Sequence, residues 1–89
     1  AVVPHLTHLL TEEEEWRYNR EIDALLVSVS ETVRVISQRN FSEDQRIELD
    51  RIRSFLKQTI ETRENDLVTA RNLVRRAQVL AGDLERSSR

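Results

Sequence analysis

The sequence contains almost none of the residues that break helices, with one Gly, Gly82, and one Pro, Pro4, in 89 residues. Sandwiches and barrels built from many short strands need Gly and Pro at closely spaced turns, so these folds are excluded. Ala, Glu, Lys, Leu and Arg, which are typical of helices, occupy 41 positions. We therefore predict an all-α chain that forms a single domain over residues 1–89.

Charge and cysteine content narrow the class of protein further. The formal net charge is −2, which argues against a broadly basic protein that coats nucleic acid or a membrane surface. No apolar run approaches the roughly 18 residues of a membrane-spanning helix, so we predict no transmembrane segment. The chain has no Cys and therefore no disulfide, and we expect an intracellular, cytoplasmic protein. It begins with Ala1 and has no signal peptide, so we expect a fragment of a longer protein.

The first half of the chain predicts one long helix over residues 12–39. Thr11 followed by Glu14 has the spacing of a capping box, which marks a helix start. Pro4 suits the first turn of a short helical segment over residues 4–10. The apolar positions of the long helix recur at steps of four and three, which places them on one face. They are Ile22, Leu26, Val29, Val33 and Ile36.

The second half predicts a turn at 40–42 and then helical sequence over residues 43–86. Ser42 followed by Gln45 repeats the capping box, and Phe41 precedes it as a hydrophobic staple would. A second stripe then follows at steps of three and four. It comprises Leu49, Ile52, Leu56, Ile60, Arg63, Leu67, Ala70, Val74, Ala77, Ala81 and Leu84.

Two architectures follow from the polar run Glu61 to Asp66, which has no Gly or Pro. A break near 63–65 gives a three-helix bundle, whereas an unbroken helix folds back on the first as an antiparallel hairpin. The hairpin is favoured because it sets Glu12–Glu15 beside Val68–Arg71, acid against base. In both, we expect coiled-coil-like packing and association into a larger helical bundle, since so small a core is marginal alone. The predicted buried seam is Ile22, Leu26, Val29, Val33, Ile36, Leu49, Ile52, Leu56 and Ile60.

Residues that could support catalysis or metal binding are sparse. His5, His8 and Glu12 follow one another at steps of three and four, which could place them on one helical face. No further His, no Cys and no recognisable nucleophile motif or Gly-rich phosphate loop accompanies them. We therefore predict no enzyme, no cofactor and no metal site.

The remaining signals favour a non-enzymatic protein–protein interaction and assembly module that associates with itself or docks partner helices. Trp16 and Tyr18 are interpreted either as core filler or as anchors for a partner. An Arg cluster late in the chain raises the alternative of a helical nucleic-acid-binding domain, and a small all-α enzyme is a third hypothesis. The candidate partner-binding residues are Trp16, Tyr18, Leu25, Val35, Val68, Arg71, Arg75, Arg76 and Val79.

Overall fold

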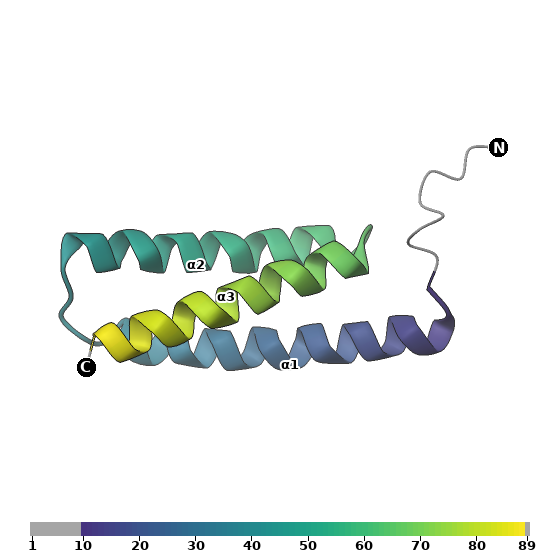
Figure 1. Cartoon of the computed structure of the whole chain (residues 1–89), viewed down its shortest axis with the longest axis horizontal. Coiled ribbons are helices and arrows are strands. Elements are labelled where there is room, and N and C mark those ends of the chain that lie inside the picture. Colours follow the sequence, from purple (N-terminus) through teal and green to yellow (C-terminus); the bar gives the residue numbers. More distant parts are fainter. Residues whose placement is uncertain (1–9, 89) are drawn as a thin grey trace.

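Three helices make up residues 10–88, which are the residues that the structure, a computed structural model, describes. Helix α1 spans Glu12–Ile36, α2 spans Glu43–Thr62 and α3 spans Leu67–Ser87. The chain runs up, down and up again, so α3 is antiparallel to α2 and parallel to α1 (Figure 1). The prediction of an all-α fold is confirmed, and no strand occurs among the described residues. Of the two predicted architectures, the structure adopts the three packed helices.

The first two helices begin where their capping boxes predict. The Thr11 amide donates to Glu14 Oε1 at 2.9 Å, and the Glu14 amide donates to Thr11 Oγ1 at 3.0 Å. The corresponding bonds of Ser42 and Gln45 measure 2.9 and 3.2 Å. Each pair satisfies backbone donors that a helix start leaves without an intrahelical acceptor, which explains why both helices start at fixed positions.

Helix α1 ends three residues before the predicted end at residue 39. Its C-cap, Ser37, turns its hydroxyl back to donate to the Val33 carbonyl at 2.7 Å. The chain then tightens into a turn in which the Arg39 amide donates to the Ile36 carbonyl. Local side-chain bonds of this kind compete with helix continuation. The predicted helical segment over residues 4–10 lies, apart from its last residue, outside the described residues.

A turn at residues 63–66 separates α2 from α3, so the continuous helix of the hairpin alternative is wrong. The amides of Asn65 and Asp66 both donate to the Thr62 carbonyl, at 2.9 and 2.8 Å. Asp66 adopts an extended conformation, and its Oδ1 accepts the Thr69 amide at 3.0 Å. An Asp at this position caps a new helix as Ser or Thr does. The chain therefore breaks here without Gly or Pro.

The core lies along the centre of the bundle and is closed by α3, whose backbone lies close to those of both α1 and α2. The buried face of α3 is rich in Ala, and small side chains let neighbouring helices approach. Outside this core the helices are strongly charged, and within residues 10–88 none has the length and apolar content needed to cross a membrane. The buried residues are Ile22, Val29, Val33, Ile36, Leu49, Ile52, Thr59, Ala70, Val74, Ala77, Ala81 and Leu84.

The predicted seam is confirmed except at its last position. Leu26 and Leu56 are half-buried against the core, but Ile60 is 57% exposed and Thr59 is buried in its place. Two successive steps of four, from Ile52, rotate Ile60 about 80° away from the helix face that Ile52 shares with the core. Thr59 can occupy the core because its hydroxyl donates to the Phe55 carbonyl at 2.7 Å.

Candidate protein interface

Charged side chains connect the helices and fix how they lie along one another. Arg63, just after α2, reaches α1 and donates to Asp23 Oδ1 and Asn19 Oδ1, each at 2.8 Å. From α3, Arg75 Nε donates to Glu21 Oε2 at 2.5 Å. These bonds tie two Arg side chains to α1.

The predicted pairing of Glu12–Glu15 with the late Arg cluster is wrong. Arg71 and Arg75 instead meet Glu21, with Arg71 Nη1 3.9 Å from Glu21 Oε1. The Arg71 guanidinium also lies over the Tyr18 ring, 4.4 Å from its centroid. The difference arises because α3 is a separate helix that runs parallel to α1. Its Arg residues therefore contact a later turn of α1 than they would in the antiparallel hairpin. Tyr18, Arg71 and Arg75 therefore stabilise the α1–α3 contact.

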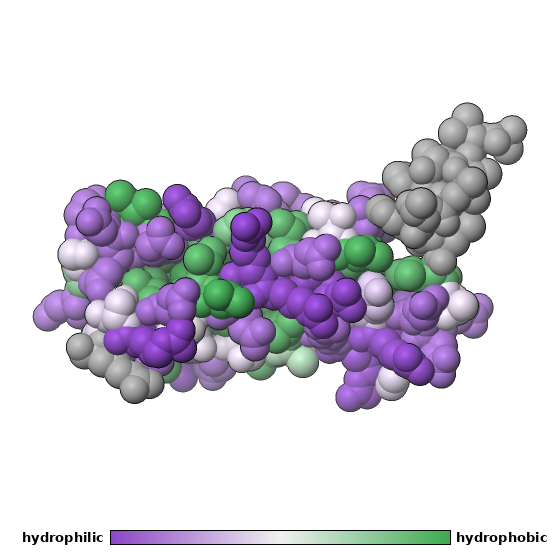
Figure 2. Space-filling view, viewed as in Figure 1, coloured by the Kyte–Doolittle hydropathy of each residue, from purple (hydrophilic) through white to green (hydrophobic). Residues whose placement is uncertain are grey.

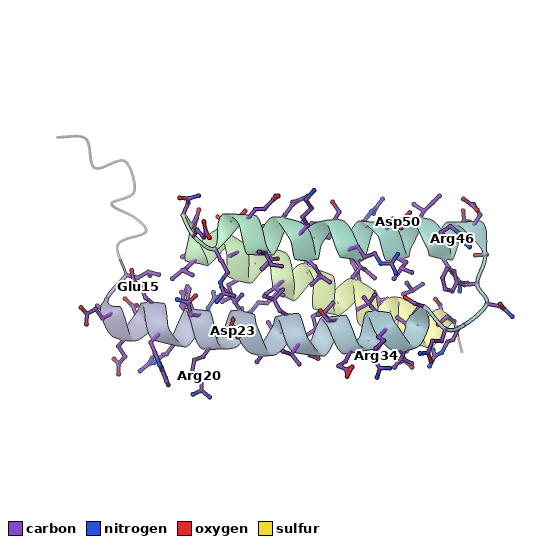
Figure 3. The ribbon with its side chains drawn as sticks, turned by 180° about the vertical axis from the view of Figure 1, so that it is seen from behind. Glu15, Arg20, Asp23, Arg34, Arg46 and Asp50 are labelled. Carbon is purple, nitrogen blue, oxygen red and sulfur yellow. The ribbon has the colours of Figure 1, made fainter. Side chains whose placement is uncertain are left out.

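Trp16 lies at the start of α1 and does not fill the core. Its side chain is 60% exposed, and the Arg20 guanidinium covers one face of the ring at 4.9 Å from the centroid. Arg20 itself points outward from α1 (Figure 3). The interpretation of Trp16 as core filler is wrong, and its exposed ring stands apart from the other candidates.

The structure does not bring the other predicted candidates onto one surface. Leu25 is half-buried and packs against the core residues of the α1–α3 contact. Val68 is half-buried near the turn between α2 and α3, and Val35 is exposed on α1. Only Arg76 and Val79 share a feature, because both belong to the side of α3 that borders a groove.

This groove runs between α2 and α3 and has an apolar floor. Its middle part holds about 400 Å³, with Phe55 and Leu80 at its base and Arg51 and Arg76 at its edges. It continues toward the start of α2 as a second hollow of about 270 Å³, which Leu80 also lines. We call the two together the α2/α3 groove. Its lining residues are Asp44, Gln45, Glu48, Arg51, Ser54, Phe55, Gln58, Arg76, Leu80, Asp83, Leu84 and Ser87.

Two exposed apolar side chains, one on each helix, lie next in helical position to residues that line the α2/α3 groove. Ile47 on α2 is 51% exposed and Val79 on α3 is 62% exposed. By helical spacing Ile47 shares a face with Asp44 and Arg51, as Val79 does with Arg76 and Asp83. Apolar surface is visible over the middle of α3, among polar side chains (Figure 2). The apolar surface at this site therefore extends beyond the floor of the groove.

The two ends of the α2/α3 groove carry opposite charges. Asp44, Glu48 and Asp83 line the hollow near the start of α2, and Arg51 and Arg76 line the middle hollow. Arg51 lies 3.7 Å from a local acid, Glu48, and Asp83 pairs with an Arg on its own helix. Among residues 10–88, Asp44 and Arg76 form no ion pair. Each hollow is thus lined by charged side chains of one sign.

Sequence reasoning missed most of this groove, including Ile47, Phe55 and Leu80. A signal does exist in the sequence, because charge, apolar residue and opposite charge recur at steps of three and four in both helices. The run is Asp44, Ile47 and Arg51 on α2, and the reverse order of charges appears on α3. Its meaning depends on knowing that α2 and α3 lie antiparallel.

No metal centre forms among the described residues, since no three His, Asp or Glu side chains come together there. The predicted metal-spaced residues His5 and His8 lie outside the described residues. Comparisons with models of protein families, with curated proteins and with solved structures find nothing that matches this chain.

Proposed function

We propose that this chain is a non-enzymatic protein–protein interaction module that docks a helix of a partner protein in the α2/α3 groove. The observation that carries the proposal is the groove itself, an apolar trough with charged edges between two helices. An amphipathic helix binds such a trough by inserting residues spaced at i, i+3, i+4 and i+7. The docked helix would add a fourth member to the bundle, with coiled-coil-like packing along α2 and α3.

The composition of the groove supports binding of protein. Interfaces concentrate apolar contacts at the centre and place charges at the rim. Here Phe55 and Leu80 form the apolar floor, and charged side chains lie at the edges. Two of the three Arg residues in the late cluster are engaged with Glu21, so nothing in the structure favours the nucleic-acid alternative.

The proposal is tested by selecting peptides from a displayed library of amphipathic helices on the wild-type chain. We expect selected peptides to lose affinity by at least about tenfold for Val79→Glu, which places a charge at the border of the groove, on the face of α3 that carries Arg76 and Asp83. Val27→Glu is the matched control, because Val27 is 66% exposed, about as much as Val79, and lies on α1. Circular dichroism should show both variants folded.

The proposal is refuted if the library yields no binder, or if the binders tolerate Val79→Glu as well as they tolerate Val27→Glu. The affinity of each selected peptide for the wild type and for each variant is measured by titration of the labelled peptide. Competition by excess unlabelled peptide shows that this binding is saturable.

A further inference from the structure

We propose that the partner held in the α2/α3 groove is a second copy of this chain, bound groove to groove about a two-fold axis. This inference rests on the proposed function and names its partner. It comes from the distribution of charge along the groove, where Asp44 and Asp83 mark one end and Arg51 and Arg76 the other.

The charges of the groove are arranged unfavourably within one molecule. Asp44, Glu48 and Asp83 line one hollow and Arg51 and Arg76 line the other, and charges of one sign gathered in one place repel. Within residues 10–88, Asp44 and Arg76 have no oppositely charged neighbour in ion-pair distance to relieve this. A bound surface of opposite charge at each end would relieve it.

A second groove supplies those opposite charges when it is turned end for end. On each helix the two charges are seven residues apart, or about 10 Å along the axis. Leu80 lines both hollows of the groove and so lies where the acidic and the basic parts meet. A two-fold axis near Leu80 places the acidic hollow of one copy against the basic hollow of the other.

The same axis brings the apolar floors of the two grooves together. Leu80 of one copy then lies near Leu80 of the other, and Phe55 adds to the apolar lining. A two-fold contact uses the same patch on both molecules, so one groove satisfies itself without any third component. An acidic or a basic partner, in contrast, would match only one end.

The experiment measures the mass of the chain in solution by sedimentation, from low-micromolar to millimolar concentration, for the wild type and two charge-reversed variants. D44K/D83K makes the acidic hollow basic on balance, with two Lys against Glu48, and R51E/R76E makes the basic hollow acidic. We expect the wild type to dimerise and each variant alone to dimerise at least about tenfold more weakly, since every contact between ends becomes repulsive. An equimolar mixture of the two variants should restore association, because basic grooves then meet acidic ones.

Matched controls carry the same changes in charge away from the groove. D50K/E61K alters two acids of α2 that do not line the groove, and Asp50 is labelled on α2 in Figure 3. R20E/R34E alters exposed Arg residues on α1. Both controls should dimerise as the wild type does, apart from a small effect of net charge that added salt removes.

Three results would each overturn the pairing: a wild type that stays monomeric at every concentration, a mixture of the two variants that fails to associate, or controls that weaken association as strongly as the groove variants. A monomeric chain that still selects helical peptides refutes only the pairing with a second copy. Failure of both experiments refutes the proposed function as well.

Discussion

Thr59 and Ile60 are adjacent residues whose burial is the reverse of what their side chains suggest, and this gives a sharp test of the core. Thr59 is 0% exposed, so Thr59→Asp buries a carboxylate at a cost of several kcal/mol, against a total stability of about 5 to 10 kcal/mol. We expect this variant to be unfolded. Ile60 is 57% exposed, and full burial of Ile contributes about 1.5 to 3 kcal/mol, so Ile60→Asp should cost only about 1 kcal/mol.

The assay is thermal and urea denaturation followed by circular dichroism. A loss of about 1 kcal/mol lowers the melting temperature of a domain of this size by about 4 to 8 °C. Thr59→Val is the control, because it keeps the shape of the side chain and removes only the hydroxyl that donates to Phe55, so it should remain folded. If Ile60→Asp unfolds the chain while Thr59→Asp melts near the wild-type temperature, the core register of α2 described above is wrong.

Three further predictions concern single contacts. Asp66→Ala should remove the cap of α3 and lower stability by about 1 kcal/mol in urea denaturation, while Asp66→Asn should retain most of it. Glu21→Lys should lower the melting temperature by placing like charges beside Arg75, and adding Arg75→Glu to the same molecule should recover part of the loss; no recovery would contradict the pairing. Ala77→Leu should cost about 1 to 3 kcal/mol by overfilling the core, and a Leu tolerated without loss would show that the α3 contact is loose.

Local sequence signals determined the helix starts and most of the core. The boxes at Thr11 and Ser42 depend only on residues three positions apart, so they can be read without knowledge of the fold. The same holds for apolar stripes such as Ile22 to Ile36, because helical periodicity is local. The single error in the predicted seam is Ile60, which follows Ile52 by two successive steps of four. Thr59, seven residues after Ile52, stays closer to the face of the helix that packs in the core.

Features that depend on contacts between helices could not be predicted in the same way. The break at 63–66 has no Gly or Pro, so the sequence predicted it only as one of two alternatives, and its one local signal is the cap formed by Asp66. The predicted hairpin placed Arg71 and Arg75 beside acidic residues in the first turn of α1. In the structure their acidic partner is Glu21. The α2/α3 groove exists only because two stretches of sequence lie side by side.

The central position of α3 has a consequence for how the chain is made. Since α3 contributes contacts to both other helices and is the last of the three to be synthesised, α1 and α2 emerge from the ribosome with their apolar stripes uncovered. Adding residues 63–87 takes about one to five seconds at typical rates of translation, and exposed apolar surface favours aggregation during that interval. We expect a chain released after Thr62 to remain without a core, so the bundle assembles only after α3 has been made, in one cooperative step.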